Sequence, residues 1–276
     1  PFVPMSFGVL AGHHRGKDFR PTRLTPTHTW AEKRGAVFVE AGAWLRAQWY
    51  PQPGERDWIE SVSREVRTVR ALVGVCDVST LGKIDVQGPD AAMLLERVYC
   101  HRVDNLPVGR VRYGLMLRDD GFVLDDGTIA RLADNRFLLT TTTANAAKVL
   151  QHIEHALQWR WPSLDAHVCS VSEQWAQLAL AGPQSRAVLA VLARNPDEVG
   201  DTGLPMGGVR AITLAGGMRA RVFRLSYSGE RAYEIAVPAS QGARLMNAIA
   251  EAGAEHHIAP YGTEAMGVMR IEKGHI

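Results

Sequence analysis

The chain has 276 residues and a formal net charge of +2, with 31 Lys and Arg residues against 29 Asp and Glu residues. This balance excludes a basic nucleic-acid-binding surface and favours a small or charge-balanced ligand, while the length suffices for about two domains. No apolar run approaches the roughly 18 residues of a membrane-spanning helix, and three scattered cysteines without a Cys-x-x-Cys motif predict free thiols, no metal site and a reducing, cytoplasmic location.

Residues 1–36 hold four prolines, several glycines and no sustained periodicity. Such a segment has no core of its own, so we predict a leader or linker that lies along another part of the protein. Because the chain starts at Pro1 without a methionine and stops at Ile276 directly after a helical pattern, we expect it to be a piece of a longer protein.

A helix is predicted over residues 59–72, where apolar side chains recur at intervals of three and four. These apolar positions are Ile59, Val62, Val66, Val69 and Leu72. Three arginines fall between them, and a solvent-exposed basic face is the simplest interpretation of Arg64, Arg67 and Arg70.

An internal repeat follows. Gly88-Pro89 and Gly182-Pro183 each end a strand pattern, and each precedes a helical pattern with the same offsets. One face of these helices holds Ala91, Leu94, Leu95 and Val98 in the first copy and Ser185, Val188, Leu189 and Leu192 in the second. A hairpin, a further strand and a second helix complete each copy, with Ala146, Val149, Leu150 and Ile153, and Leu245, Ala248, Ile249 and Ala252, on the second helices.

Each copy is interpreted as strand-helix-strand-strand-helix, the split β-α-β arrangement of ferredoxin-like folds, in which helices cover one face of an antiparallel sheet. The predicted fold class is therefore α+β, with two tandem ferredoxin-like units over residues 37–170 and 171–276. Two such units side by side leave a cleft between them, and ligand sites favour such interfaces.

Asp120-Gly121 lies between two apolar runs and predicts a tight hairpin with positive φ at both turn positions. Asp125 and Asp126 follow in the second run, where a strand should continue to bury itself. Asp is depleted in strands and is rarely buried without a partner. The pair therefore marks either a turn or cap, or the lining of a cavity.

A carboxylate held beside apolar walls can accept a hydrogen bond from an amine or amide of a ligand, or take its proton, and partial burial moves its pKa toward the working range. The candidate walls are Met116, Phe122 and Leu124. The second unit offers a polar hairpin at residues 226–230, and Glu234 follows it, although an ordinary strand position explains Glu234 equally well.

Several common sites are absent from the sequence. No Gly-x-Gly-x-x-Gly follows a strand and no Gly-x-x-x-x-Gly-Lys-Ser/Thr occurs, so we predict no dinucleotide or triphosphate site in this chain. The Gly-x-Ser-x-Gly elbow of serine hydrolases is also missing. Adjacent histidines at His13-His14 and His256-His257 cannot both face one metal from a strand or helix.

Five motifs resemble, in order and spacing, the folate-binding family of the glycine-cleavage aminomethyltransferase over residues 37–276: Cys76-Asp-Val-Ser79, Asp85-Val-Gln-Gly-Pro-Asp-Ala91, Gly121-Phe-Val-Leu-Asp-Asp126, Ala179-Leu-Ala-Gly-Pro183 and Tyr227-Ser-Gly-Glu-Arg-Ala-Tyr-Glu-Ile235. Further stretches are similar to the carboxy-terminal part of sarcosine oxidase alpha subunits: Arg112-Tyr-Gly-Leu-Met-Leu-Arg118, Thr140-Thr-Thr-Thr143, Pro260-Tyr-Gly-Thr-Glu264 and Arg270-Ile-Glu-Lys-Gly274. Residues 6–12 and 25–30 resemble the linker of those subunits.

The resemblance implies a tetrahydrofolate site. Its key carboxylate corresponds to Asp126, with Asp125 as the close alternative. Tyr227 and Glu234 match the family's pterin-binding tyrosine and glutamate. Two residues on the other strand of the first hairpin are further candidate ligand contacts, Tyr113 and Met116.

The chain departs from the family pattern at one position. Met266 stands where the aminomethyltransferases have an arginine that contacts folate. This departure weakens the interpretation as a plain aminomethyltransferase and leaves Arg270 as the nearby cation, without an assigned role.

The resemblance also implies a function, which is to pass the one-carbon unit of oxidised sarcosine to tetrahydrofolate, giving methylenetetrahydrofolate and glycine. FMN, FAD and NAD are then expected in other parts of the enzyme, and the chain alone is expected to be inactive as an oxidase. The implied partners are reduced folate and the other subunits of a hetero-oligomer, especially the beta subunit. Two alternatives stay open: a stand-alone aminomethyltransferase, and a non-catalytic folate-binding protein of iron-sulfur assembly.

Overall fold

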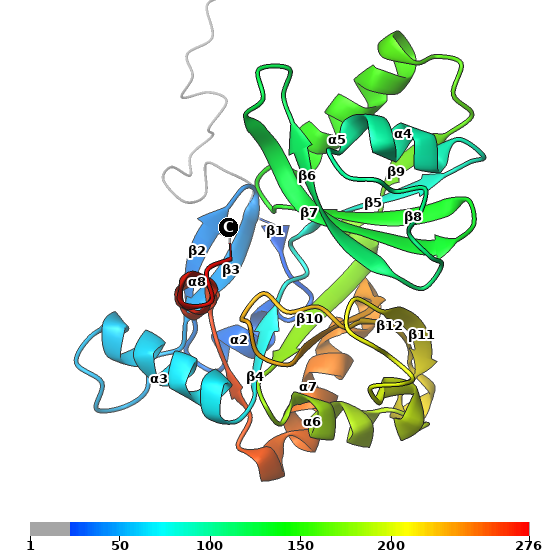
Figure 1. Ribbon diagram of the computed structural model, residues 1–276. Helices are drawn as coiled ribbons and strands as arrows, with labels where there is room; N and C mark the ends of the chain where they lie inside the picture. Colours follow the sequence, from blue (N-terminus) through cyan, green and yellow to red (C-terminus); the bar gives the residue numbers. More distant parts are fainter. Residues whose placement is uncertain (1–22, 276) are drawn as a thin grey trace, which may run out of the picture.

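The computed structural model describes residues 23–275, so most of the predicted leader lies outside the described residues (Figure 1). The described chain forms a three-stranded sheet of order β1-β3-β2, a five-stranded sheet of order β6-β7-β8-β5-β9 and a six-stranded sheet of order β11-β12-β13-β10-β4-β14. None of its helices within residues 23–275 combines the length and the apolar composition that a membrane crossing requires.

The part of the predicted leader that is described has regular structure. It begins with β1 (Arg23–Leu24) and α2 (His28–Glu32), which precede the hairpin of β2 (Val37–Ala41) and β3 (Trp44–Trp49). β1 pairs in parallel with β3, and Trp30 and Ala31 of α2 are buried in the core of the second unit. Residues 23–36 therefore lie against another part of the protein, as expected of the leader, and they contain a short strand and a short helix.

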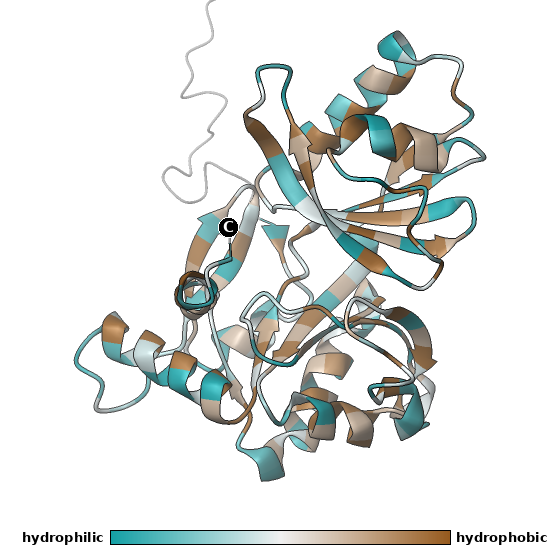
Figure 2. Ribbon diagram, in the orientation of Figure 1, coloured by the Kyte–Doolittle hydropathy of each residue, from teal (hydrophilic) through white to brown (hydrophobic). Residues whose placement is uncertain are grey.

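Helix α3 (Trp58–Ala71) confirms the prediction for residues 59–72. The Asp57 side chain accepts a hydrogen bond from the Glu60 amide at 3.0 Å and so caps its first turn. Hydrophobic and hydrophilic bands alternate along the helix in Figure 2. The prediction of a basic solvent-exposed face is wrong for two of the three arginines, since only Arg67 is exposed and the others form ion pairs, namely Arg64 and Arg70.

Both predicted copies of the repeat are present. The first consists of β5 (Gly82–Gln87), α4 (Ala91–Val98), β6 (Val111–Leu117), β7 (Val123–Ala133), β8 (Arg136–Thr141), α5 (Ala146–His155) and β9 (His167–Ser170). The second consists of β10 (Trp175–Ala181), α6 (Ser185–Leu192), β11 (Val209–Thr213), β12 (Arg219–Phe223), β13 (Ala232–Pro238) and α7 (Gly242–Ala252). Three strands separate the two helices of each copy, one more than the strand-helix-strand-strand-helix pattern, and the predicted α+β class is confirmed.

The glycine of each Gly-Pro pair has a structural reason. Gly88 has a φ of 134° and Gly182 a φ of 125°, in the region that side chains rarely adopt. A Cβ atom on Gly88 would lie 2.3 Å from the Asp165 carbonyl oxygen, and one on Gly182 would lie 2.4 Å from the Leu72 carbonyl oxygen. Only glycine therefore fits the sharp turn from strand to helix in both copies.

The two units stack with their sheets facing each other and their helices outside (Figure 1). Helices α4 and α5 bury their apolar faces against the five-stranded sheet, and α6 and α7 bury theirs against the six-stranded sheet. A small apolar cluster joins the two sheets, formed by Ala130, Leu138, Val209, Phe223 and Ala236. The two sheets are therefore in apolar contact through this cluster.

Three elements outside the repeat complete the second unit. β4 (Gly74–Asp77) pairs with β10 and with β14 (Ala259–Pro260), and α8 (Thr263–Glu272) packs against α3 and β3. Residues 74–77 thus belong to the sheet of the second unit, although in the chain they come before β5, the first strand of the first copy. The proposed domain bounds of 37–170 and 171–276 separate strands that are hydrogen-bonded to each other.

The predicted hairpin joins β6 to β7, but its turn is of another kind. Gly121 has a φ of 83°, whereas Asp120 has no positive φ. The Gly121 amide donates to the Arg118 carbonyl at 2.9 Å, and the Arg118 amide donates to the Phe122 carbonyl at 2.8 Å. This is a three-residue loop in which only the last position is left-handed, so the expectation of two positive φ angles is wrong.

Candidate functional site

Asp125 and Asp126 are neighbours on β7 and therefore point to opposite faces of the strand. Asp125 is buried and accepts three hydrogen bonds: from the Thr142 amide at 3.0 Å, from Thr142 Oγ1 at 2.6 Å and from Asn145 Nδ2 at 3.1 Å. Its carboxylate thereby joins β7 to the turn that begins α5. This is the turn-or-cap role that the sequence left open, and it leaves Asp125 little capacity for a ligand.

Asp126 is only partly buried and lies toward the other unit. The Tyr113 hydroxyl donates a hydrogen bond to Asp126 Oδ2 at 3.0 Å. Burial and this bond to a carboxylate raise the pKa of Tyr113 to about 12, so the phenol stays protonated and remains a donor. The side chain of Tyr113 is 45% exposed, which keeps the pair accessible.

Tyr227 brings the second unit to this pair. It lies on the loop between β12 and β13, is 48% exposed, and makes no hydrogen bond through its hydroxyl within residues 23–275. Partial burial raises the pKa of Tyr227, and the Asp126 carboxylate adds to that effect. The Tyr227 loop of the second unit therefore lies within electrostatic range of the pair formed by Asp126 and Tyr113 in the first unit.

Glu234 lies on β13, where Gln177 Nε2 donates to its carboxylate. Burial raises the pKa of Glu234, whereas Gln177 and the ammonium of Lys83 act in the opposite direction. Lys83 comes from the first unit, is 1% exposed, and donates through Nζ to the carbonyls of Ser79 at 3.0 Å and Leu81 at 2.9 Å. Burial lowers the pKa of Lys83 to about 8.

The chain matches one protein family along almost its whole length. The family described as the GCVT N-terminal domain matches residues 27–276. The chain belongs to this family. Its resemblance to the aminomethyltransferase family, inferred from the motifs, is confirmed by this match.

Individual relatives and solved structures agree with the family. The chain is 51% identical over all 276 residues to sarcosine oxidase subunit alpha of Rhizobium meliloti and 46% identical to that of Corynebacterium sp. strain P-1, and spans 28% of the length of each. It is 33% identical over 256 residues to the aminomethyltransferase of Symbiobacterium thermophilum, covering 91% of this chain and 64% of that relative.

Among solved structures, the glycine cleavage system aminomethyltransferase T of Bartonella henselae superposes with a TM-score of 0.76 at 26% identity, covering 92% of this chain and 63% of that one. A chain of the heterotetrameric sarcosine oxidase of Corynebacterium sp. U-96 superposes with a TM-score of 0.53 at 17% identity, covering 85% and 96%. The second likeness concerns the fold alone. Together they confirm the predicted aminomethyltransferase fold.

One of the predicted ligand contacts lies apart from the other candidate site residues. Met116 is 1% exposed and packs in the core of the first unit, because it alternates with Tyr113 and Leu115 along β6 on the side of α4. Its Cα partner is Asp125, the structural carboxylate. The structure therefore does not bring Met116 to the surface that Asp126, Tyr113 and Tyr227 share.

Met266, which the resemblance aligns with the family's arginine, lies on α8 and packs against the apolar cluster between α3 and α8. Arg270 lies one turn further along the same helix. It is close enough to Tyr227 to lower the pKa of that phenol, against the larger effect of burial. Helix α8 therefore carries a cation, Arg270, one turn beyond Met266 and within electrostatic range of Tyr227.

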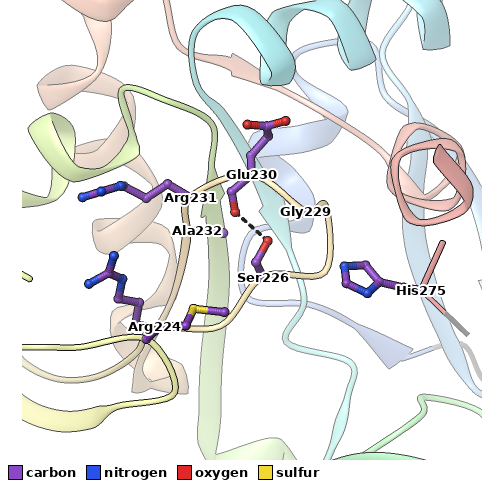
Figure 3. A pocket seen from close by; sticks show the side chains of 8 residues that line it. Arg224, Ser226, Gly229, Glu230, Arg231, Ala232 and His275 are labelled. Atoms are coloured by element: carbon purple, nitrogen blue, oxygen red, sulfur yellow. Dashed lines mark hydrogen bonds between the residues drawn. The ribbon is translucent and has the colours of Figure 1, made fainter. Parts of the chain in front are cut away.

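A cavity of about 310 Å³ lies against the β12–β13 loop. Figure 3 shows Ser226, Gly229 and Glu230 on the loop and His275 across from it, whereas the side chains of Arg224 and Arg231 point away. Neither Asp126 nor Tyr113 lines this cavity. Two polar side chains of the loop that line the cavity are paired. Ser226 Oγ donates to the Glu230 carbonyl at 2.5 Å, and the Glu230 carboxylate forms an ion pair with Arg70 at 2.8 Å. We therefore place the candidate site at Asp126, Tyr113 and Tyr227 instead.

Three residues near the site were not identified from the sequence: Arg46 on β3, Lys83 on β5 and Gln177 on β10. Lys83 lies on β5, where the apolar Ile84 and Val86 alternate with the polar Lys83, Asp85 and Gln87, so the sequence gives no sign that this lysine is buried. Gln177 and Arg46 carry no signal either, because both occur at positions where an exposed polar residue is ordinary.

Proposed function

We propose that this chain is the folate-binding part of a sarcosine oxidase alpha subunit, which passes the one-carbon unit of oxidised sarcosine to tetrahydrofolate and yields methylenetetrahydrofolate and glycine. The sarcosine oxidase alpha subunits are 46% to 51% identical to the chain over its full length, whereas the aminomethyltransferase of Symbiobacterium thermophilum is 33% identical. This difference favours the oxidase over a stand-alone aminomethyltransferase.

The residues present fit a reduced folate. Its pterin ring is a flat group edged with N–H donors and acceptors. The surface shared by the two hairpins offers the carboxylate of Asp126 and the phenols of Tyr113 and Tyr227. Strand β13 adds the carboxylate of Glu234, which the resemblance assigns to the pterin. The Tyr227 hydroxyl has no hydrogen-bond partner within residues 23–275, so it is free to bind a ligand. We assign these four side chains to the tetrahydrofolate, with Met116 as part of the supporting core.

Bound tetrahydrofolate would supply the nitrogen atoms that accept the one-carbon unit. Asp126 would accept a hydrogen bond from an N–H of the ligand and take its proton, which requires a fixed carboxylate at hydrogen-bond distance. The hydrogen bond from Tyr113 fixes one oxygen of Asp126 and leaves the other available. Glu234, held by Gln177, would orient the pterin ring.

The single observation that carries the proposal is the division of labour between the two neighbouring carboxylates: Asp125 is fully hydrogen-bonded inside the first unit, and Asp126 is open toward Tyr227. The test uses the complete protein with sarcosine and tetrahydrofolate. Asp126→Asn should leave sarcosine oxidation intact and slow methylenetetrahydrofolate formation by roughly 10² or more, the usual contribution of one general base.

In that variant formaldehyde should accumulate in place of methylenetetrahydrofolate. Asp126→Glu is the matched control, because it keeps the base and should retain part of the transfer. An equal loss of oxidation and transfer in Asp126→Asn would assign the residue to structure and contradict the proposal. The same phenotype from Asp125→Asn in a protein of unchanged stability would move the role to Asp125.

The proposal extends to the rest of the enzyme. We place the FMN, FAD and NAD sites outside this chain, and we expect the other subunits, the beta subunit especially, as partners in a cytoplasmic hetero-oligomer. The structure of a sarcosine oxidase that resembles the chain in fold is described as heterotetrameric, which supports a partnership of this kind.

A further inference from the structure

Arg46 is a partly buried arginine for which the described residues 23–275 provide no hydrogen-bond or ion-pair partner. It lies on β3, and its Nε atom is fully buried and makes no hydrogen bond. Its side chain forms no ion pair within residues 23–275. Arg131 also has a buried Nε without a partner, but its other nitrogens donate to the carbonyls of Asp104, Leu106 and Asp134. Leaving a buried guanidinium unpaired is costly, so Arg46 needs another explanation.

Arg270 is a second cation that no carboxylate within residues 23–275 pairs with, and it lies on the helix that packs against β3. Gln48 Nε2 of β3 donates to Glu264 Oε1 of α8 at 2.8 Å, which holds strand and helix together. Arg46 and Arg270 thus come from two elements in direct contact.

Tyr227 connects both arginines to the candidate site. Its loop lies on the end of α8, because the guanidinium of Arg70 donates to the carbonyls of Ser228 at 2.6 Å and Met269 at 3.0 Å. Burial is the main influence on the pKa of Tyr227 and raises it, and Arg270 and Arg46 both act to lower it. Two arginines without an ion-pair partner among residues 23–275 therefore lie within electrostatic range of one phenol.

We propose that Arg46 and Arg270 form a carboxylate-binding site beside Tyr227. A guanidinium binds a carboxylate through two parallel N–H donors, and this geometry is worth most where water is partly excluded. The inference rests on the proposed function for the identity of the ligand. That function supplies two sources of a carboxylate: the glutamate tail of tetrahydrofolate, and the amino acid that carries or releases the one-carbon unit, for which glycine is the probe.

The experiment measures binding to the complete protein by calorimetry, with Arg46→Gln and Arg270→Gln as the variants. Arg67→Gln is the matched control, because Arg67 is an exposed arginine on α3 for which the structure shows no partner within residues 23–275. The ligands are tetrahydrofolate, tetrahydropteroate, which lacks the glutamate, and glycine. Glycine is titrated both with and without tetrahydropteroate.

A glutamate-tail site predicts that each variant binds tetrahydrofolate about tenfold more weakly and tetrahydropteroate unchanged, since a charged hydrogen bond is lost. A site for the amino acid predicts the same loss for glycine. Unchanged affinity for both carboxylates, or an equal loss for tetrahydropteroate, would overturn the proposal. A wild-type protein that binds neither pterin would refute the folate function, while the titration of glycine alone would still test the arginines. Arg46→Lys, which keeps the charge, replaces Arg46→Gln if that variant does not fold.

Discussion

Asp125 and Asp126 show how strongly one step along a strand changes the role of a side chain. The first points into its own unit and is saturated with hydrogen bonds, and the second points toward the opposite unit. An acidic pair in the sequence predicts that one of the two has a special environment. The sequence does not tell which of the two aspartates this is, because the register of β7 depends on its pairing with β6 and on a bulge near Leu117.

The two carboxylates should therefore differ in their effect on stability. Asp125→Asn replaces an acceptor of three hydrogen bonds by an amide that brings donors of its own, so we expect a loss of about 1–3 kcal/mol in the free energy of unfolding. Asp126→Asn should change it by less than about 0.5 kcal/mol, as is usual for exposed positions. Urea titration of both variants at pH 7 measures the difference, and equal losses would contradict the assignment of Asp125 to structure.

Glu65 on α3 provides a prediction of pH dependence. It is fully buried and accepts hydrogen bonds from the amides of Tyr50 at 2.6 Å and Gly262 at 2.8 Å. Burial raises the pKa of Glu65 from 4.5 to about 7. A raised pKa means that the folded state holds the proton more tightly than the unfolded state, so the contribution is full below pH 4.5 and is lost as the pH rises through about 7.

We expect this residue to contribute on the order of 3 kcal/mol to the fall in stability between pH 4.5 and 7, from about 1.4 kcal/mol per pKa unit. Glu65→Gln, which keeps an acceptor and cannot ionise, should flatten that part of the stability profile. Unfolding in urea at several pH values compares the two proteins. If both profiles have the same slope between pH 4.5 and 7, the carboxylate does not titrate in this range.

Single residues at the site were partly predictable. The motifs pointed to Asp126, Tyr113, Tyr227 and Glu234, and the structure brings the first three together. The buried Lys83 and the unpaired Arg46 were missed, because the burial of a cation results from the packing of distant strands rather than from its own neighbours in the sequence. Met116 was predicted to contact the ligand because it lies on the strand opposite the acidic pair. The sequence did not show that its side chain points into the core.

At the scale of elements, one arginine holds together the segments that carry Tyr227 and Arg270. Arg70 of α3 forms ion pairs with Glu230 of the β12–β13 loop and with Glu272 of α8, both at 2.8 Å. It also donates to one backbone carbonyl of each segment. Such a residue fixes the loop without touching the ligand, so we regard it as a positioning residue.

Arg70→Met should therefore lower the free energy of unfolding by about 1–3 kcal/mol and loosen the loop, since several charged hydrogen bonds are lost at once. It should also weaken tetrahydrofolate binding without changing the rate of sarcosine oxidation. Urea titration and proteolytic cleavage within residues 226–230 report on the two structural effects. Arg67→Met on the same helix is the control, and equal behaviour of the two variants would show that Arg70 has no special role.

Helices in which apolar residues recur regularly were predictable from the sequence. The turns that connect the elements were less predictable. The helices of both copies appear where apolar residues recur at three and four positions, and Gly88 and Gly182 end the strands before them. The turn at Gly121 was assigned the wrong type, because Asp-Gly permits both a two-residue loop and a three-residue loop ending in glycine. The short α2 was missed, since it has five residues and is held by tertiary packing.

The whole molecule is two repeats that interlock, and this was the part least visible in the sequence. β4 directly precedes β5 along the chain, yet β4 pairs with β10 and β5 pairs with β8 and β9. Proximity in sequence favoured placing residues 74–77 in the first unit. The pairing is decided instead by apolar side chains in and directly before β4, since Val75 and Val73 complete the core of the second unit.

This arrangement predicts which parts of the protein unfold together. Leu94 on α4 and Val188 on α6 occupy equivalent positions of the two copies, are fully buried, and belong to separate cores. Val188→Ala should lower the opening free energy of the β4 and β10 amides by roughly 1–3 kcal/mol, through the cavity that it leaves, and should leave the β5 amides nearly unchanged.

Leu94→Ala is the reciprocal control and should weaken the β5 and β8 amides by about 2–5 kcal/mol, with little effect on β4. Native-state hydrogen exchange, followed residue by residue, measures both variants in one experiment. The decisive amides are those of Val75 and Cys76. These residues come before β5, the first strand of the first copy, in the chain, but they pair with β10 in the sheet of the second unit. If they respond to Leu94→Ala rather than to Val188→Ala, residues 74–77 unfold with the first unit and the domain bound belongs at residue 170. If they follow Val188→Ala, the second unit is assembled from two separate segments of the chain, with the first unit inserted between them.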